Sequence, residues 1–153
     1  MIGEIALLLD QPRGASAVAV EKSRLIKIAA SDVLKLDIDT PYLHLKLWEN
    51  YCLHTLENSV AANSDYQHLS KTELDQWFDG YTLSELERGA DETAPEGLGF
   101  LFVAYGRVRC GDEEKSQGSL IAYGSEPMAI VALESPTRVI WLPQLPSDYA
   151  RSG

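Results

Sequence analysis

The interpretation of this chain starts from one stretch near its N-terminus, Gly3-Glu4-Ile5-Ala6-Leu7-Leu8-Leu9-Asp10-Gln11-Pro12-Arg13-Gly14-Ala15-Ser16. At its beginning, a glycine that permits close backbone approach stands next to the carboxylate of Glu4. At its end, Arg13 precedes small residues whose backbone N–H groups can face an anion. Arginine neutralises a phosphate through charge-assisted hydrogen bonds, and a glutamate accepts a hydrogen bond from a sugar hydroxyl. The stretch therefore suits a ligand with hydroxyls and a phosphate, and the alternative is a β-turn with a surface Arg–Glu pair.

The residues around this stretch predict short strands followed by helices. Apolar runs at Ile5–Leu9 and Ala17–Ile28 are β-like, and the second, rich in Val and Ile, predicts a hairpin of two strands. A short helix is expected over 31–37. Thr40 before a proline is typical of a helix N-terminus, and apolar residues at spacings of three and four then predict the longest helix over 41–61.

The polar segment 63–69 predicts a linker, after which the pattern changes. Ser70-Lys-Thr-Glu73 is a capping box that predicts a short helix, and Thr82-Leu-Ser-Glu85 repeats the box, with Gly89 ending that helix or turn. From Gly97 onward, short apolar runs bounded by Gly, Pro, Asp and Ser predict a β-rich roll or sandwich. These runs contain Leu101, Val103, Val108, Leu120-Ile121, Ile130-Val131 and Val139-Ile140-Trp141-Leu142.

An internal repeat links the two parts of the chain. Ala19-Val20-Glu21 followed by Arg24-Leu25-Ile26-Lys27-Ile28 has a counterpart in Ala132-Leu133-Glu134 followed by Arg138-Val139-Ile140-Trp141-Leu142. The later copy has one extra residue between its two blocks. We therefore expect the end of one domain followed by much of a second, related domain.

The N-terminal stretch resembles the phosphate-binding cassette of the cyclic-nucleotide-binding domains found in the CRP/FNR, protein kinase A regulatory subunit and cyclic-nucleotide-gated channel superfamily. The shared pattern is Gly-Glu-(Leu/Ile)-Ala-Leu, a few residues, then Pro-Arg-x-Ala-(Ser/Thr). The resemblance implies that Glu4 bonds the ribose 2′-hydroxyl, Arg13 the cyclic phosphate and the amides around Gly14 and Ala15 the phosphate oxygens. The implied ligand-binding set is Gly3, Glu4, Ile5, Ala6, Arg13, Gly14, Ala15 and Ser16, with Gly3 and Ala6 shaping the wall.

The resemblance also implies the fold and the domains. The fold class is mainly β with helices: a cyclic-nucleotide-binding-type β-roll, which is a jelly roll or cupin-like double-stranded β-helix, with flanking α-helices. The strands at 17–28 resemble the last two roll strands, and the helix at 41–61 resembles the lid over the base. The implied domains are 1–62, the end of a first domain; 63–69, a linker; 70–146, a degenerate second roll; and 147–153, a tail.

The two copies are incomplete in opposite ways. After Gly118 the second copy has Ser125 in place of the glutamate after Gly124, no Pro-Arg and a deletion, so it is not expected to hold a cyclic nucleotide. The first copy keeps the cassette but lacks the early strands. Two alternatives follow: the chain is a fragment of a tandem-domain protein, or the strands at 98–123 complete the roll around the cassette in a permuted arrangement.

Composition and spacing exclude several classes of function. The 153 residues carry a net charge of −10, so the molecule repels nucleic-acid backbones and anionic membranes. Without a membrane-spanning run or a signal-peptide start, we expect a cytoplasmic chain with two reduced thiols, Cys52 and Cys110. The histidines His44, His54 and His68 do not form a metal site, and no nucleophile, DNA-reading motif or metal cluster is recognisable, so we expect no enzyme and no cofactor.

The resulting expectation is a non-enzymatic regulatory module. Its ligand is cAMP or cGMP, and binding rearranges the helix at 41–61. The alternative is a ligand-free interaction or dimerisation module derived from such a domain, with that helix as its interface. The expected partners are the cyclic nucleotide and either a second copy or a larger parent protein.

Overall fold

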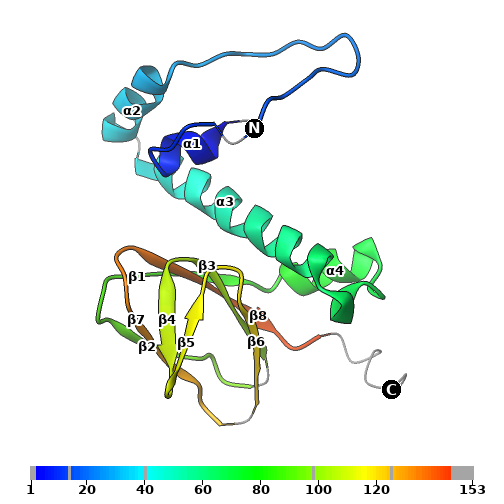
Figure 1. Cartoon of the computed structure of the whole chain (residues 1–153), viewed down its shortest axis with the longest axis vertical. Helices are drawn as coiled ribbons and strands as arrows, with labels where there is room; N and C mark the ends of the chain where they lie inside the picture. Colours follow the sequence, from blue (N-terminus) through cyan, green and yellow to red (C-terminus); the bar gives the residue numbers. More distant parts are fainter. Residues whose placement is uncertain (1–2, 14, 40, 98, 125, 146–153) are drawn as a thin grey trace. The chain divides into compact units, whose positions relative to one another are not determined.

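Helices occupy the first half of the chain and strands the second. The computed structural model describes residues 3–13, 15–39, 41–97, 99–124 and 126–145 (Figure 1). The helices are α1 Glu4–Leu8, α2 Ala30–Asp39, α3 Pro41–Ala62 and α4 Lys71–Phe78, with a 3₁₀ turn, η1, at Ser64–Tyr66. The strands are β1 Thr82–Leu86, β2 Asp91–Thr93, β3 Gly99–Tyr105, β4 Arg107–Cys110, β5 Glu113–Ser116, β6 Leu120–Tyr123, β7 Ala129–Ala132 and β8 Thr137–Pro143.

The strands form two antiparallel sheets of four strands each. One sheet has the order β1-β8-β3-β6 and the other the order β2-β7-β4-β5. The chain therefore crosses repeatedly between sheets, which is the connectivity of an eight-stranded jelly roll. This arrangement, with helices flanking it, is the expected β-roll and confirms the fold class (Figure 1).

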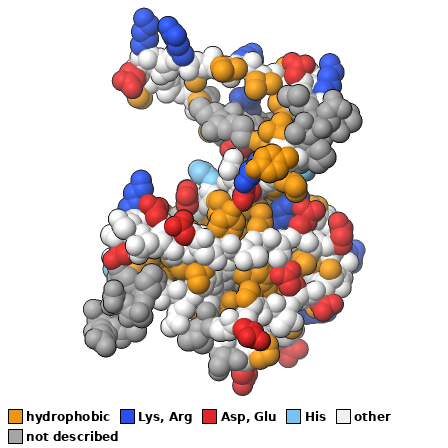
Figure 2. Space-filling view, turned by 180° about the vertical axis from the view of Figure 1, so that it is seen from behind, with side chains coloured by type: hydrophobic (Ala, Val, Ile, Leu, Met, Phe, Trp, Pro, Cys, Tyr) orange, Lys and Arg blue, Asp and Glu red, His pale blue; other side chains and the backbone are white. Residues whose placement is uncertain are grey.

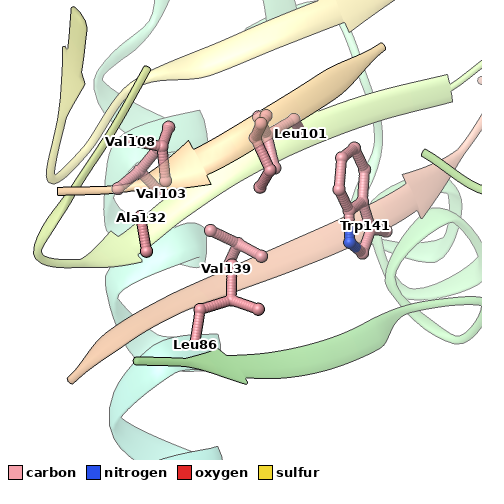
Figure 3. Close-up of a cluster of buried hydrophobic side chains, with 8 residues drawn as sticks. Leu86, Leu101, Val103, Val108, Ala132, Val139 and Trp141 are labelled. Carbon is pink, nitrogen blue, oxygen red and sulfur yellow. The ribbon is translucent and has the colours of Figure 1, made fainter. Parts of the chain in front are cut away.

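The interior of the roll is filled by side chains. Figure 3 shows Leu101, Val139 and Trp141 pointing into the same space between the sheets. Strand alternation places every second residue there, so β3 and β8 contribute residues at intervals of two. The buried cluster comprises Leu86, Leu101, Val103, Val108, Ile130, Ala132, Val139 and Trp141.

The outer face of the first sheet is buried as well. On β3, the Phe100 ring lies 5.0 Å from that of Trp77 in α4 and 6.3 Å from that of Tyr66, between ring centroids. The Trp77 indole Nε1–H donates a hydrogen bond to the Pro143 carbonyl at 2.8 Å, which ties α4 to the end of β8. Because both of its faces are covered, β8 reads as a continuous apolar run rather than an alternating one.

The chain divides into two compact units inside α3, one ending at Tyr51 and the other beginning at Cys52. The second unit thus includes the C-terminal part of α3, where Cys52 and Leu56 are fully buried. The expected linker at 63–69 contains the turn η1, capped by Asn63. The assignment of 1–62 and 70–146 as related domains stays a prediction, and the tail lies outside the described residues.

Most predicted elements after residue 29 are confirmed. The helices expected at 31–37 and 41–61 are α2 and α3, and Ser70 forms both hydrogen bonds of its capping box with Glu73. Thr40, the expected N-cap of α3, is not among the described residues. All the apolar runs after Gly97 are strands.

Two predicted strand regions near the N-terminus are wrong. Ile5–Leu8 lies in the helix α1 and Leu9 is its C-cap, because Glu, Ala and Leu are strong helix formers and no strand among the described residues pairs with this run. Ala17–Ile28 contains no strand, and its Val20 and Ile26 are 99% and 92% exposed. β-propensity expresses packing on a pleated surface, and the described residues give this segment no strand to pair with.

The helix predicted at the second capping box is also wrong. Thr82–Leu86 is the strand β1, which pairs antiparallel with β8 from Thr82 opposite Trp141 to Leu86 opposite Thr137. Pairing with a distant strand overrides the local Thr-x-x-Glu signal. Gly89 does lie in a turn, with a φ of 85°.

The repeat supplies a matched pair of substitutions that tests this difference in packing. Ile140→Ala removes a fully buried side chain and is expected to lower the free energy of unfolding by about 2–5 kcal/mol. Ile26→Ala, at the equivalent position of the first copy, removes an exposed side chain and should change it by less than about 0.5 kcal/mol. Urea denaturation of the full chain measures both, and equal losses would contradict the fold described here.

Candidate functional site

The predicted ligand-binding stretch is a helical turn closed by two unusual backbone positions. Gly3 precedes α1 in the left-handed region with a φ of 92°. After α1 the chain reverses at Asp10, which has a φ of 49°, and the Gln11 N–H donates to the Ala6 carbonyl at 3.1 Å. This bond and the left-handed residue before it are features of a Schellman-type helix end. Asp10 occupies the position usually held by glycine, which aspartate tolerates better than most residues.

The turn brings Arg13 back against Gly3. A methyl group at Gly3 would lie 3.0 Å from Arg13 Nη1 and 3.2 Å from Cζ, so the guanidinium lies directly beside the glycine. The side chain of Arg13 is exposed and makes no ion pair with any described residue. Glycine suits position 3 for two reasons: it adopts the left-handed backbone conformation without strain, and it leaves space for the guanidinium of Arg13.

One oxygen of the carboxylate next to Gly3 has no hydrogen-bond donor among the described residues. Within the described part of the chain, Glu4 Oε2 is buried and has no hydrogen-bond partner. A buried carboxylate oxygen without a donor is unfavourable, because it has lost its water and gained nothing in exchange. A ligand hydroxyl placed against Glu4 would supply the missing donor.

Two of the remaining predicted residues, Ala15 and Ser16, line a hollow together with Arg13. Arg13, Ala15, Ser16 and Ala17 line an open hollow of about 660 Å³. Gly14 lies outside the described residues. Ile5 and Ala6 lie in α1, which has no buried residue, and Ile5 is 39% exposed.

A second, smaller hollow lies behind the turn and was not predicted from the sequence. It has a volume of about 80 Å³ and is apolar except for one histidine. It lies between α1, α2 and the N-terminal part of α3, and all of its lining residues belong to the N-terminal unit. The apolar periodicity of 41–61 includes two of the lining residues, Leu43 and Leu47. The residues of α1 are predicted as a strand, so their contribution to the hollow is not predicted. The lining residues are Leu7, Leu8, Val33, Leu34, Leu43, His44 and Leu47.

Between β6 and β7, the described residues form no helical turn like the one at Glu4–Leu8. β6 ends at Tyr123 and β7 begins at Ala129, so a short loop replaces the fourteen residues of the N-terminal stretch. Ser125, the predicted replacement for the glutamate, is outside the described residues. The Tyr123 ring packs edge-on against Trp141 inside the roll, with centroids 5.6 Å apart.

The other candidate residues have ordinary structural roles. His44 Nε2 accepts from the Trp48 indole N–H at 3.0 Å, and His54 lies 3.1 Å from the side-chain amide of Asn58. Glu92 accepts from Ser84 and from Trp141 inside the roll. Among the described residues, no three His, Cys, Asp or Glu side chains are grouped as a metal site. No described helix combines the length and the apolar character needed to cross a membrane.

Both cysteines are free thiols. Cys52 is fully buried on α3, and burial raises its pKa to about 12, with Arg138 and Glu85 close enough to influence it. A thiol that does not ionise is a poor nucleophile. Cys110, on β4, has its pKa raised by partial burial.

No family model matches this sequence, and no curated protein matches it. Solved structures that match in fold include the sensor domain of the transcriptional regulator DNR from Pseudomonas aeruginosa, with 14% identity and a TM-score of 0.46 over 56% of this chain and 72% of that one. The regulatory domain of Toxoplasma gondii PKA with cAMP has 12% identity and a TM-score of 0.43 over 59% of this chain. The regulatory subunit of a cAMP-independent protein kinase A from Trypanosoma brucei has 16% identity and a TM-score of 0.41 over 60% of it. The chain spans 41% of each of these two kinase subunits.

The buried thiol of Cys52 predicts a loss of stability in alkaline solution. Its pKa is higher in the folded chain than in the unfolded chain, where thiols ionise near pH 9.0. Its contribution is therefore complete below pH 9 and is lost as the pH rises towards 12, by about 1.4 kcal/mol per pH unit. Urea denaturation from pH 8 to 10.5 should show a shallower decline for Cys52→Ala than for the unaltered chain. Parallel declines would contradict the burial of this thiol.

Proposed function

We propose that the chain is a regulatory module whose N-terminal turn binds a cyclic nucleotide, cAMP or cGMP, and that it has no catalytic role. The observation that carries this proposal is the pairing of an exposed Arg13 guanidinium with a buried, unbonded carboxylate oxygen of Glu4 in one short turn. One group attracts an anion and the other needs a hydroxyl donor. A ribose cyclic phosphate carries an anionic group and a hydroxyl donor on one rigid ring system.

The proposed contacts follow from the chemistry of each group. Arg13 neutralises the cyclic phosphate and donates to its oxygens, and the backbone N–H groups around Gly14 and Ala15 complete the anion site. Glu4 accepts from the ribose 2′-hydroxyl. Gly3 and Ala6 form the wall, with Ile5 and Ser16 at its edges. These roles follow the motif that the stretch resembles.

Coupling to output is supported by the hollow behind the turn. It is a partly open, apolar hollow of about 80 Å³ between α1, α2 and α3. A change in the position of α1 on ligand binding would alter its contacts with α2 and α3 across this hollow. A ligand that binds one position of the turn more tightly than another would shift the population of the helix arrangement by that difference in affinity.

A second candidate function is a ligand-free interaction module. It is supported by the exposed apolar side chains of the N-terminal unit, among them Tyr42 and Leu45 on α3, at 64% and 59% exposure. In such a module, α3 would form the interface with the partner. A protein of this kind would bind neither cAMP nor cGMP.

Isothermal titration calorimetry of the full chain with cAMP and with cGMP tests the proposal. Arg13→Ala removes a charged hydrogen-bonding partner and should weaken binding by about 1.5–3 kcal/mol, or roughly tenfold to 150-fold. Lys22→Ala, which removes another exposed cation of the same unit, is the matched control and should leave the affinity unchanged. Saturable binding that Arg13→Ala leaves unaltered would remove Arg13 from the site, and no binding at millimolar ligand favours the second candidate.

Gly3→Ala should impair the same site without altering any ligand-contacting side chain. The added methyl group would meet the Arg13 guanidinium at 3.0 Å and force a residue with a β-carbon into the left-handed region. The expected result is a loss of affinity of at least tenfold in the same titration. Full affinity in Gly3→Ala would mean that the position of Arg13 against Gly3 is not the one used for binding.

A further inference from the structure

Four of the described strands lie at the borders of the two sheets, and one of them differs from the other three. The border strands are β1 and β6 in one sheet and β2 and β5 in the other. Edge strands in native proteins commonly carry charged side chains, because an uncharged edge is open to pairing with another chain. β1 carries Glu85, β2 carries Asp91 and Glu92, and β5 carries charges at three of its four positions. β6, with the sequence Leu-Ile-Ala-Tyr, carries none.

The backbone of β6 is paired on one side only. All four of its residues pair with β3. The Val103 N–H on β3 donates to the carbonyl of Ser119, just before β6, at 3.0 Å. Because backbone groups alternate in direction along an antiparallel strand, those of the second and fourth residues of β6 also face β3. The N–H and C=O groups of Leu120 and Ala122, its first and third residues, therefore point away from β3, and no backbone group of the described strands and loops bonds to them.

Apolar rows run across the sheet to this edge on both of its faces. On the outer face, Ile140 of β8 is opposite Phe102 of β3, which is opposite Leu120 of β6. The row on the inner face consists of Trp141, Leu101 and Ile121. The two members on β6 are half-buried, because the rows end there. A strand added beyond β6 would extend both rows, so apolar side chains on both of its faces would suit it.

Two carboxylates flank one end of this edge. Glu96 lies three residues before Gly99, Glu126 lies three residues after Tyr123, and Gly99 and Tyr123 pair with each other. Three residues span at most about 11 Å, so both glutamates lie close to the Tyr123 end of β6. Both are exposed, and neither forms an ion pair with a described residue.

The wider surface of the roll is acidic as well. Residues 61–153 contain 15 Asp and Glu against 7 Lys and Arg. Figure 2 shows Asp and Glu side chains spread over the visible face of the roll. The edge of β6 is thus uncharged itself but lies in an acidic surrounding, which attracts a positively charged partner.

We propose that the free edge of β6 binds an extended segment of a partner protein, in which lysine or arginine residues precede an apolar run. The segment adds to the sheet as a further strand. Main-chain hydrogen bonds to Leu120 and Ala122 give affinity, and side chains give specificity. An antiparallel strand, the orientation of the whole sheet, begins beside Tyr123, so its basic residues come first and meet Glu96 and Glu126.

A second copy of this chain fits the edge less well than a basic segment does. Its own β6 brings no cation to the two glutamates, and each copy carries a net charge of −10, so the two copies repel each other. The proposal goes beyond nucleotide binding and does not depend on it, because β6 lies outside the N-terminal turn.

Fluorescence anisotropy of a labelled peptide, titrated with the full chain in the absence of nucleotide, tests the proposal. The probe is the peptide Lys-Lys-Val-Ile-Thr-Ile-Val with blocked termini, and the comparison peptide has Glu-Glu in place of Lys-Lys. The lysine peptide should bind saturably and more weakly as salt is added, and the glutamate peptide should bind at least tenfold more weakly. No saturable binding of the lysine peptide at millimolar chain would overturn the proposal.

Ala122→Pro tests the backbone contact. It removes an N–H that points away from β3 and leaves the ladder with β3 in place, and proline is tolerated on edge strands. The lysine peptide should bind roughly fivefold more weakly to it, because one main-chain hydrogen bond is lost. Ala122→Ser, which keeps the N–H, is the matched control. Undiminished binding to an Ala122→Pro variant that circular dichroism shows to be folded would overturn the proposal.

Glu126→Lys tests the charge without touching the backbone of β6. It should weaken binding of the lysine peptide about fivefold and strengthen binding of the glutamate peptide. Asp91→Lys, an equal change of charge at an exposed position on the edge strand β2 of the other sheet, is the control and should have little effect. Equal effects of the two reversals would overturn the proposal. So would a concentration-dependent dimer of the chain in sedimentation that Ala122→Pro abolishes, because it would assign the edge to a second copy.

Discussion

The pairing of β8 with strands on both of its sides is the constraint on which the second unit depends. Its backbone groups bond to β1 and β3, and its side chains are buried on both faces, from Val139 inside to Ile140 outside. Neither the sheet nor its helical cover can form without it, because unpaired buried backbone groups are unfavourable. The same pattern at 17–28 has no strand on either side among the described residues, and it stays in water.

This contrast explains how far the sequence predicts the fold. The capping box of Ser70 specifies a helix through contacts three residues apart, and the apolar run Val139–Leu142 specifies a strand that is buried on both faces. Both predictions are correct because the information is local or because the required neighbours are present. The Thr-x-x-Glu signal predicts a helix at Thr82–Leu86. The segment is a strand because it pairs with β8, which lies far along the chain and which the local signal does not report. Residues 17–28 were predicted as strands because propensity cannot report whether a partner exists.

The candidate site divides in the same way. The resemblance of the stretch to a phosphate-binding cassette predicts Gly3, Glu4 and Arg13 as site residues, and the structure places Arg13 against Gly3 and leaves Glu4 Oε2 without a partner among the described residues. The resemblance does not predict the hollow between α1, α2 and α3, since three helices must be placed before a space between them exists. The turn carries an exposed guanidinium and a buried carboxylate oxygen without a partner among the described residues, and a small apolar hollow lies between α1, α2 and α3. The exposed segment 17–28 joins this turn to α2.

Binding of a cyclic nucleotide by the turn at residues 3–16 is the function proposed for this chain. The most direct measurement is ¹H–¹⁵N correlation spectroscopy of the full chain during a titration with cAMP and with cGMP. The account predicts saturable shifts that are largest for the amides of Gly3, Glu4, Arg13 and Ala15, with smaller shifts in α1 and α2. Shifts centred on the strands of the roll, or a spectrum that millimolar nucleotide leaves unchanged, would contradict it.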